Sequence, residues 1–274
     1  MKLRYRVKKA ANLKDLESFE RHCGDRWLFR GVRDACWNLE STLDRVPWPK
    51  KRWKLEAGLV RKFQRHGHLY DTIAPKMSSI MEWLALMQHY GAPTRLLDFT
   101  YSFWVAVFMA CEKQGKEDAA AVWAVDWKWL KKRRLQVLSK KVRKAYDKDK
   151  HCRRSSTFKR VYGKRIKTKL VIQQNAFRLN ERHVIQQGVF LCPTVVEKSF
   201  EENLRAMAPT GKVLRKLIIP ASLGTKVRKR LWRMNMTSAV LYPGLDGFAR
   251  SLAHMADLPD VLAPHGLLPL GHEE

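Results

Sequence analysis

Residues 88–110 read QHYGAPTRLLDFTYSFWVAVFMA, and this stretch decides how the chain is expected to fold. The segment Gly91 to Pro93 carries the turn-forming residues that end a preceding helix. From Phe103 to Glu112 nearly every residue is apolar, which is typical of a helix buried on all sides. Thr100 and Ser102 come just before that helix, where hydroxyl groups either cap the helix or line a pocket. A turn and a buried helix so close together favour one compact mixed domain.

Helical and strand-like segments alternate on both sides of this block. Apolar residues at helical spacing predict helices over Lys54–Tyr70, Met77–Tyr90, Leu223–Met234 and Asp246–Ala256. Runs rich in β-branched and aromatic residues predict strands over Trp27–Val32, Ala119–Trp127, Leu170–Phe177, Gly188–Pro193, Lys216–Pro220 and Ala239–Tyr242. Helix caps are expected at Ser78 or Ser79, at Gly91 and at Asp246. The sequence therefore predicts a single α+β domain over residues 1–256 and a loose C-terminal tail over 257–274.

The composition excludes several classes of protein. Hydrophobic residues make up 45% of the 274 residues, too many for a disordered chain. No run reaches the roughly 18 uncharged apolar residues of a membrane helix. The basic start, Met1 to Lys9, is not followed by an apolar region, so no secretory signal is expected. We expect a cytoplasmic protein.

Neither a disulfide framework nor a metal site is predicted. The chain has five cysteines at irregular spacing, without a C-x-x-C pair. Buried or inert thiols in a reducing compartment are expected instead. The nine histidines show no H-E-x-x-H spacing or other metal-binding pattern.

The strongest signal in the composition is positive charge. The chain carries a formal net charge of +28, and residues 128–169 alone hold 19 Lys/Arg against two acids. We predict one exposed helix over Trp129–Tyr146, followed by a mobile basic insertion. Such a charge attracts RNA or DNA, although a charged run is often only a solvated surface. The candidate nucleic-acid contacts are Lys131, Lys132, Arg133, Arg134, Arg153, Arg154, Lys164 and Arg165.

Three further stretches contain polar residues that core packing does not require. In WLFRGV, Arg30 lies in a strand between apolar residues and needs an anionic partner, and Gly31 allows another backbone or a ligand to approach closely. In RHVIQQGVF, residues 182–190, two glutamines precede a strand. In LYPGLDGFARSL, residues 241–252, a turn leads into a helix.

These features, in this order, resemble the FRG-domain family. The resemblance rests on the Phe29-Arg30-Gly31 strand, the 88–98 block, the Gln-x-Gly-x-Phe element at residues 186–190 and the Leu-Tyr-Pro-Gly-Leu-Asp-Gly segment that starts at residue 241. It extends over about residues 10–256. Phe99 and Phe103 depart from the Trp and Pro that the family pattern has there, and the basic insertion is unusually large.

The order of these motifs is also similar to that of ADP-ribosyltransferases, which implies a split sheet flanked by helices and NAD as substrate. Under that resemblance, the catalytic residues are Arg30 and either Gln186 or Gln187, which replace the usual glutamate. The NAD-binding residues it implies are Arg30, Thr100 and Ser102. Three further candidates for this site are Gly31 for close approach, Tyr90 for stacking and Arg95 for contact with the ligand. Glu181 and Glu197 are nearby acids that could supply the missing charge. The resemblance also implies a toxin or phage-defence effector, with a neutralising or partner protein.

The alternatives to these roles stay open in the sequence. Arg30 could form an ion pair with Asp98 or Asp34, and Arg95 could pair with Asp98 to brace the turn. Gln186 and Gln187 are adjacent in a predicted strand, so at most one would face a site. The alternative function is a catalytically inactive, basic nucleic-acid-binding or assembly module.

Overall fold

The computed structural model describes residues 2–47, 51–70, 79–114, 118–175, 177 and 181–256. The predicted tail over 257–274 lies outside these residues. The strands are β1 Arg6–Lys9, β2 Trp27–Val32, β3 Leu97–Thr100, β4 Ala120–Asp126, β5 Val171–Gln174, β6 Gly188–Pro193 and β7 Leu214–Ile219. The longer helices are α1 Leu13–Cys23, α2 Arg52–His66, α3 Ile80–His89, α4 Phe103–Cys111, α5 Trp127–Val137, α6 Lys140–Lys148, α7 Ser155–Tyr162, α10 Ala221–Arg233 and α12 Leu245–Ala256. The shorter helices are α8 Glu181–Ile185, α9 Phe200–Ala206 and α11 Ser238–Leu241.

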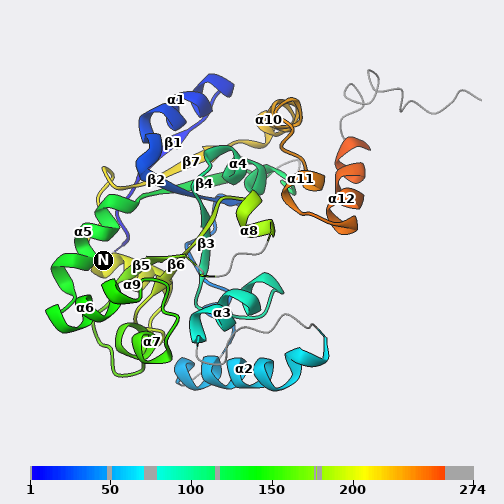
Figure 1. The fold of residues 1–274 in the computed structure, drawn as a ribbon. Helices are drawn as coiled ribbons and strands as arrows, with labels where there is room; N and C mark the ends of the chain where they lie inside the picture. The colour runs from blue at the N-terminus through cyan, green and yellow to red at the C-terminus, as the bar shows by residue number, and fades with distance from the viewer. Residues whose placement is uncertain are drawn as a thin grey trace, which may run out of the picture.

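Within the described residues, one mixed sheet organises the molecule (Figure 1). Its strand order is β1-β7-β4-β2-β3-β6-β5, and β1 pairs in parallel with β7 whereas the other neighbours are antiparallel. The prediction of a single mixed α+β domain is confirmed. No described helix has both the length and the apolar character needed to cross a bilayer.

Helices cover both faces of the sheet, and the central strand β4 shows why. All seven residues of β4 are buried. Ala121, Trp123 and Val125 belong to one hydrophobic core, and Ala120, Val122 and Ala124 belong to the other. Because side chains alternate across a strand, apolar residues at the first six positions of β4 require a packed layer on each side. One core receives α2, α3, α5 and α7, and the other receives α1, α4 and α10.

The sheet divides between β2 and β3. β2 pairs with β4 along its whole length, from Trp27 to Val32, but with β3 only through Phe29 and Thr100. Beyond that pair the two strands separate. The split leaves the second half of β2, which contains Arg30 and Gly31, without a backbone partner on the β3 side.

The basic segment packs into the fold as three helices, so the prediction of one helix over Trp129–Tyr146 was wrong. The segment forms α5, α6 and α7, which lie together on the side of the molecule opposite α12 (Figure 1). The expected single helix ends at Val137, and Ser139 starts the next helix by accepting a hydrogen bond from the Val142 N–H. Phe158 and Tyr162 of α7 are buried in the core shared with α3. The apolar faces of these short helices hold the segment against the sheet.

One predicted strand is a helix. Ala239–Tyr242 was expected to be extended, but Ser238–Leu241 forms α11, capped by the Thr237 side chain. Tyr242 directly follows α11, and its hydroxyl donates a hydrogen bond of 3.1 Å to Glu112 Oε2. Asp246, expected as the cap of α12, lies inside its first turn.

Candidate functional site

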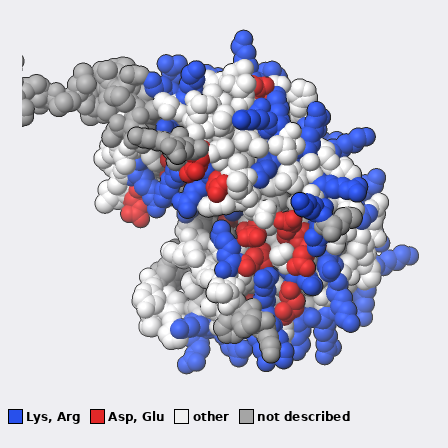
Figure 2. Space-filling view, turned by 180° about the vertical axis from the view of Figure 1, so that it is seen from behind, with Lys and Arg blue, Asp and Glu red and all other residues white. Residues whose placement is uncertain are grey.

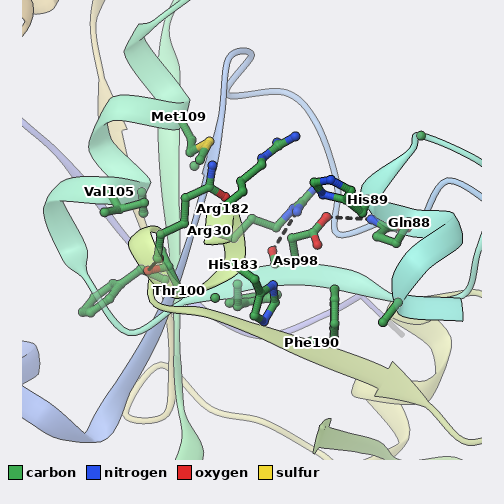
Figure 3. A pocket seen from close by; sticks show the side chains of 18 of the residues that line it. Arg30, Gln88, His89, Asp98, Thr100, Val105, Met109, Arg182, His183 and Phe190 are labelled. Atoms are coloured by element: carbon green, nitrogen blue, oxygen red, sulfur yellow. Dashed lines mark hydrogen bonds between the residues drawn. The ribbon is translucent and has the colours of Figure 1, made fainter. Parts of the chain in front are cut away.

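A pocket of about 600 Å³ opens where β2 and β3 separate (Figure 3). Its walls come from β2, α3, β3, α4, α8, the α8–β6 turn and the start of β6. The polar and charged residues that line it are Arg30, Glu82, Gln88, His89, Asp98, Thr100, Arg182, His183 and Gln186. Phe29, Leu86, Phe99, Val105, Met109 and Phe190 supply most of its apolar surface. The pocket therefore combines cations, two carboxylates and apolar walls.

Arg30 spans the gap between the two strands. Its Nη1 donates a hydrogen bond of 2.7 Å to the backbone oxygen of Asp98, where a regular ladder would have a backbone bond. Burial lowers the pKa of Arg30; the Asp98 carboxylate opposes this shift, and Arg45 adds to it. A guanidinium has five N–H donors, so one bond to a carbonyl leaves others for an anion. The expected alternative pair with Asp34 does not form: the Asp34 side chain accepts from the Cys36 N–H instead.

Asp98 is held in place by the rest of the 88–98 block. Gln88 Nε2 donates to Asp98 Oδ2 at 2.6 Å, and the Thr94 hydroxyl donates to Gln88 Oε1 at 2.6 Å. This chain of hydrogen bonds fixes which end of the Gln88 amide faces the carboxylate. The sequence stretch therefore positions one acid on the pocket wall, close to Arg30 (Figure 3).

The same block sends Arg95 away from the pocket. Arg95 is buried, and its Nε donates to Glu56 Oε1 at 2.7 Å while its Nη2 pairs with Glu56 Oε2. Burial alone disfavours the charge, but Glu56 outweighs it and raises the pKa of Arg95. Arg95 therefore does not line the pocket, where a ligand contact was predicted, and it pairs with Glu56 and not with Asp98. Arg95 lies in the bend before β3, whereas Asp98 lies inside the strand, and the two side chains bond to different partners.

His183 is positioned by the Gln-x-Gly-x-Phe element. Its ring lies 4.8 Å from the Phe190 ring, centroid to centroid. A Cβ on Gly188 would come within 2.7 Å of the imidazole, so only glycine leaves room for this ring. Burial lowers the pKa of His183, and burial together with Arg182 lowers that of His89. Both imidazoles thus favour the neutral form beside the two arginines.

Arg182 is the second cation of the pocket and rests on the Leu-Tyr-Pro-Gly segment. Its guanidinium carbon lies 4.7 Å from the Tyr242 ring centroid, a cation–π contact. A Cβ on Gly247 would meet the Tyr242 carbonyl oxygen at 1.7 Å, so the helix after this turn packs closely on it. Motifs far apart in the sequence therefore support a single pocket.

The remaining predicted site residues divide into two groups. Gly31, Thr100 and Gln186 line the pocket with Arg30, whereas Tyr90, Arg95, Ser102 and Gln187 are not among its lining residues. Thr100 donates to the Gln186 backbone oxygen at 2.7 Å, and Gln186 Nε2 donates to the Leu241 oxygen at 2.8 Å. Ser102 caps α4, because its side chain accepts from the Val105 N–H.

The predicted glutamine strand is a turn. Gln186 and Gln187 lie between α8 and β6, and Gln187 has a left-handed backbone with φ of 47°. Tyr90 is 57% exposed, and its ring meets His89 edge to face at 5.0 Å. Glu197, expected as a compensating acid, accepts from the backbone N–H groups of residues 52 and 53 at the start of α2.

Sequence reasoning missed Glu82 and Arg182 as pocket residues. Glu82 is a buried acid among the apolar residues 80–87 of helix α3, and that isolated polar position was the available signal. Among the described residues, no group of three or more His, Cys, Asp or Glu side chains could hold a metal ion. All five cysteines are free, and burial raises the pKa of the Cys23 thiol to about 11 and that of Cys111 to about 12.

The basic candidates also divide by exposure. Lys131, Lys132, Arg153, Arg154, Lys164 and Arg165 are exposed, and Arg133 is half-buried. Arg134 is buried: its guanidinium stacks over Tyr146 at 4.3 Å and lies 3.7 Å from Asp147. Arg134 was predicted to contact nucleic acid, but its buried side chain stabilises the packing of α5 against α6. Figure 2 shows Lys and Arg around most of one face, with Asp and Glu gathered near its middle.

Replacing Gly31 by alanine should destabilise the fold by about 1–3 kcal/mol or more. The added Cβ would meet the Ala106 oxygen at 2.0 Å and the Ala110 nitrogen at 2.6 Å, and both belong to the backbone of α4. Gly58→Ala in α2 is the matched control, because nothing lies within 4 Å of its Cβ position. That change should stabilise the helix by about 0.5–1 kcal/mol. Urea unfolding measures both, and equal stability of the two variants would contradict the close approach.

The comparison with protein families gives one match: residues 25–119 match the FRG domain. No curated protein matches the chain, and no solved structure does. The matched stretch contains β2 with Arg30, all of α3, β3 with Asp98, and α4, and so most of the residues that line the pocket. Residues 25–119 of the chain therefore form an FRG domain.

Proposed function

We propose that the pocket binds NAD and that the protein is an ADP-ribosyltransferase-like enzyme acting in the cytoplasm. The observation that carries the proposal is the placement of Arg30 and Arg182 in one pocket of about 600 Å³ with aromatic and imidazole rings. This volume lies within the roughly 300–1,000 Å³ of ligand sites. Arginine binds a pyrophosphate through two parallel hydrogen bonds. The apolar rings of Phe190 and His183 offer a surface for nicotinamide or adenine.

Transfer of ADP-ribose breaks the bond between the ribose and nicotinamide and develops positive charge on the sugar. A nearby carboxylate stabilises that charge. Gln186 cannot do so, because it brings no charge and its amide is bonded to Leu241. Glu82 and Asp98 are the lining carboxylates, and they supply the negative charge in this proposal.

The acceptor proposed here is a nucleic acid or a protein bound to one. The net charge of +28 and the exposed lysines and arginines of α5 to α7 would deliver such a polyanion to the protein. A toxin or phage-defence effector with a neutralising partner protein is the biological role that this activity would serve. The second candidate function, a basic nucleic-acid-binding or assembly module without catalysis, rests on the same surface charge.

One experiment separates the two functions. The purified chain is incubated with NAD labelled in its adenylate part, together with cellular RNA, DNA and protein. The enzyme predicts label on one of these classes and release of nicotinamide. If NAD is neither consumed nor bound while RNA or DNA binding falls steeply with salt, the transferase proposal fails and the binding module stands. If the chain binds neither NAD nor nucleic acid, both candidates fail.

A further inference from the structure

The start of helix α5 is fixed rigidly to the end of β4. Asp126 is fully buried, and its Oδ1 accepts hydrogen bonds from the backbone N–H groups of Lys128 and Trp129, at 2.9 and 3.1 Å. The same carboxylate forms an ion pair with Arg26. A charged N-cap that is also paired holds the first turn of the helix in one position. The residues of this first turn, including Trp127, therefore have a fixed position relative to β4.

Trp127 is the first residue of that helix, and its ring is held at one edge. The indole N–H donates to the Asp25 backbone oxygen at 3.2 Å, and the side chain is half-buried against the core. The rest of the ring borders a shallow groove along α5. The groove is lined by Trp127, Lys128, Lys131, Lys132, Leu135 and Gln136.

The groove is strongly cationic. Its three lysines are exposed, and none of them forms an ion pair with any residue in the described part of the chain. No acidic residue lines it. At 1.5 Å per residue, Lys128 to Lys132 extend over about 6 Å of one helix face. Lys128 Nζ lies 5.9 Å from the Trp127 ring centroid, a cation–π contact, so Lys131 and Lys132 are the lysines that remain for an anion. An aromatic ring beside these two ammonium groups fits a ligand with both a flat base and a phosphate.

We propose that this groove binds a single-stranded segment of nucleic acid, with one unpaired base against Trp127 and the adjoining phosphates on Lys131 and Lys132. Base faces are hidden in a duplex, so an aromatic platform selects unpaired strands. The inference deepens the proposed function, because it rests on a nucleic-acid partner and names the form that is bound. RNA and DNA share this chemistry, and the test uses both.

The test measures the affinity of the full chain for unstructured poly-rU and oligo-dT, and for a duplex of equal length, at two salt concentrations. Trp127→Ala should weaken single-strand binding by roughly 10-fold or more, whereas Trp127→Phe, which keeps an aromatic face, should retain most of the affinity. Lys131→Ala with Lys132→Ala should reduce the slope of log K against log salt by about 1.4. Trp37→Ala is the matched control: Trp37 is 39% exposed and follows the other end of β2.

Each outcome decides the inference. Preference for single strands that is lost in Trp127→Ala, but kept in Trp37→Ala, supports it, and the stronger of the two single-strand arms identifies RNA or DNA. Equal binding of duplex and single strands, with no effect of Trp127→Ala, overturns the groove but leaves the nucleic-acid partner of the proposed function. If the chain binds none of the three probes, both the groove and the nucleic-acid partner of the proposed function are overturned. Because Trp127 contacts the core, melting temperatures are measured for all variants, and the lysine pair tests the groove if Trp127→Ala does not fold.

Discussion

Glu56→Ala should destabilise the protein by about 3–5 kcal/mol, a large part of the roughly 5–15 kcal/mol that holds a typical domain folded. Glu56 and Arg95 have side chains only 7% and 4% exposed. Removing the acid leaves the Arg95 guanidinium buried with two backbone acceptors, the oxygens of Tyr162 at 3.0 Å and Pro193 at 3.4 Å. A buried charge without its counter-charge is far more costly than an unmade surface pair. Urea unfolding measures the loss.

Glu17→Ala is the matched control for this prediction. Glu17 also pairs with an arginine, Arg230 at 3.7 Å, but the two side chains are 35% and 46% exposed. Exposed pairs contribute about 0–1 kcal/mol, so this variant should be nearly as stable as the parent. The double variant Glu56→Leu with Arg95→Met removes both charges and should recover much of the loss. If Glu56→Ala and Glu17→Ala have the same free energy of unfolding, the Glu56–Arg95 pair does not contribute the stability assigned to it.

The sequence was most informative where apolar patterning was dense. The predicted bounds of β2 and β6 agree with the structure, because apolar residues predominate in both strands and polar residues flank them. The buried helix α4 also begins where predicted, behind its Ser102 cap. In these segments local propensity and burial favour the same structure, and one-dimensional patterns suffice.

The apolar pattern did not predict the structure of segments in which most residues are charged and only a few are buried. β1 is an edge strand in which three of the four residues are basic, and nothing in Arg6–Lys9 indicates that it pairs with β7. In residues 128–169 a few buried residues such as Leu130, Phe158 and Tyr162 hold the segment against the sheet despite its 19 lysines and arginines. Lysine and arginine stems cover apolar surface while their charges stay in water, so a highly basic helix can still pack.

The candidate site was predictable in part. Arg30 could be identified because a strand arginine among apolar residues needs a partner. The role of Asp98 could not, because it depends on the Gln88 and Thr94 bonds and on the separation of β2 from β3. Glutamines expected to act as catalytic groups lie in a turn whose geometry follows from the contact of Thr100 with Gln186. Tertiary contacts of this kind leave no periodic trace in a sequence.

Arg30→Ala should reduce both NAD affinity and labelling at least about a hundredfold, the largest functional effect expected for a single change. Two charge-assisted hydrogen bonds to a pyrophosphate contribute about 1.5–3 kcal/mol each, and alanine replaces neither. Arg30→Lys should recover little, because an ammonium is a point charge without the planar fork of a guanidinium. Affinity is measured by calorimetry, and labelling by transfer of the adenylate label to the macromolecular acceptor.

Arg61→Ala supplies the control for lost charge, because Arg61 is exposed on α2 and is not among the residues that line the pocket. The Arg30 variant also loses the bond from Nη1 to the Asp98 oxygen, so its folded fraction must be measured in the same samples. A loss of labelling that follows a loss of folded protein would assign Arg30 to the fold alone. Parent-like labelling in a fully folded Arg30→Ala protein would remove Arg30 from the site. Loss of NAD binding with an intact fold, and with Arg61→Ala unaffected, is the expected result, because the bridge to Asp98 holds the guanidinium where β2 and β3 separate.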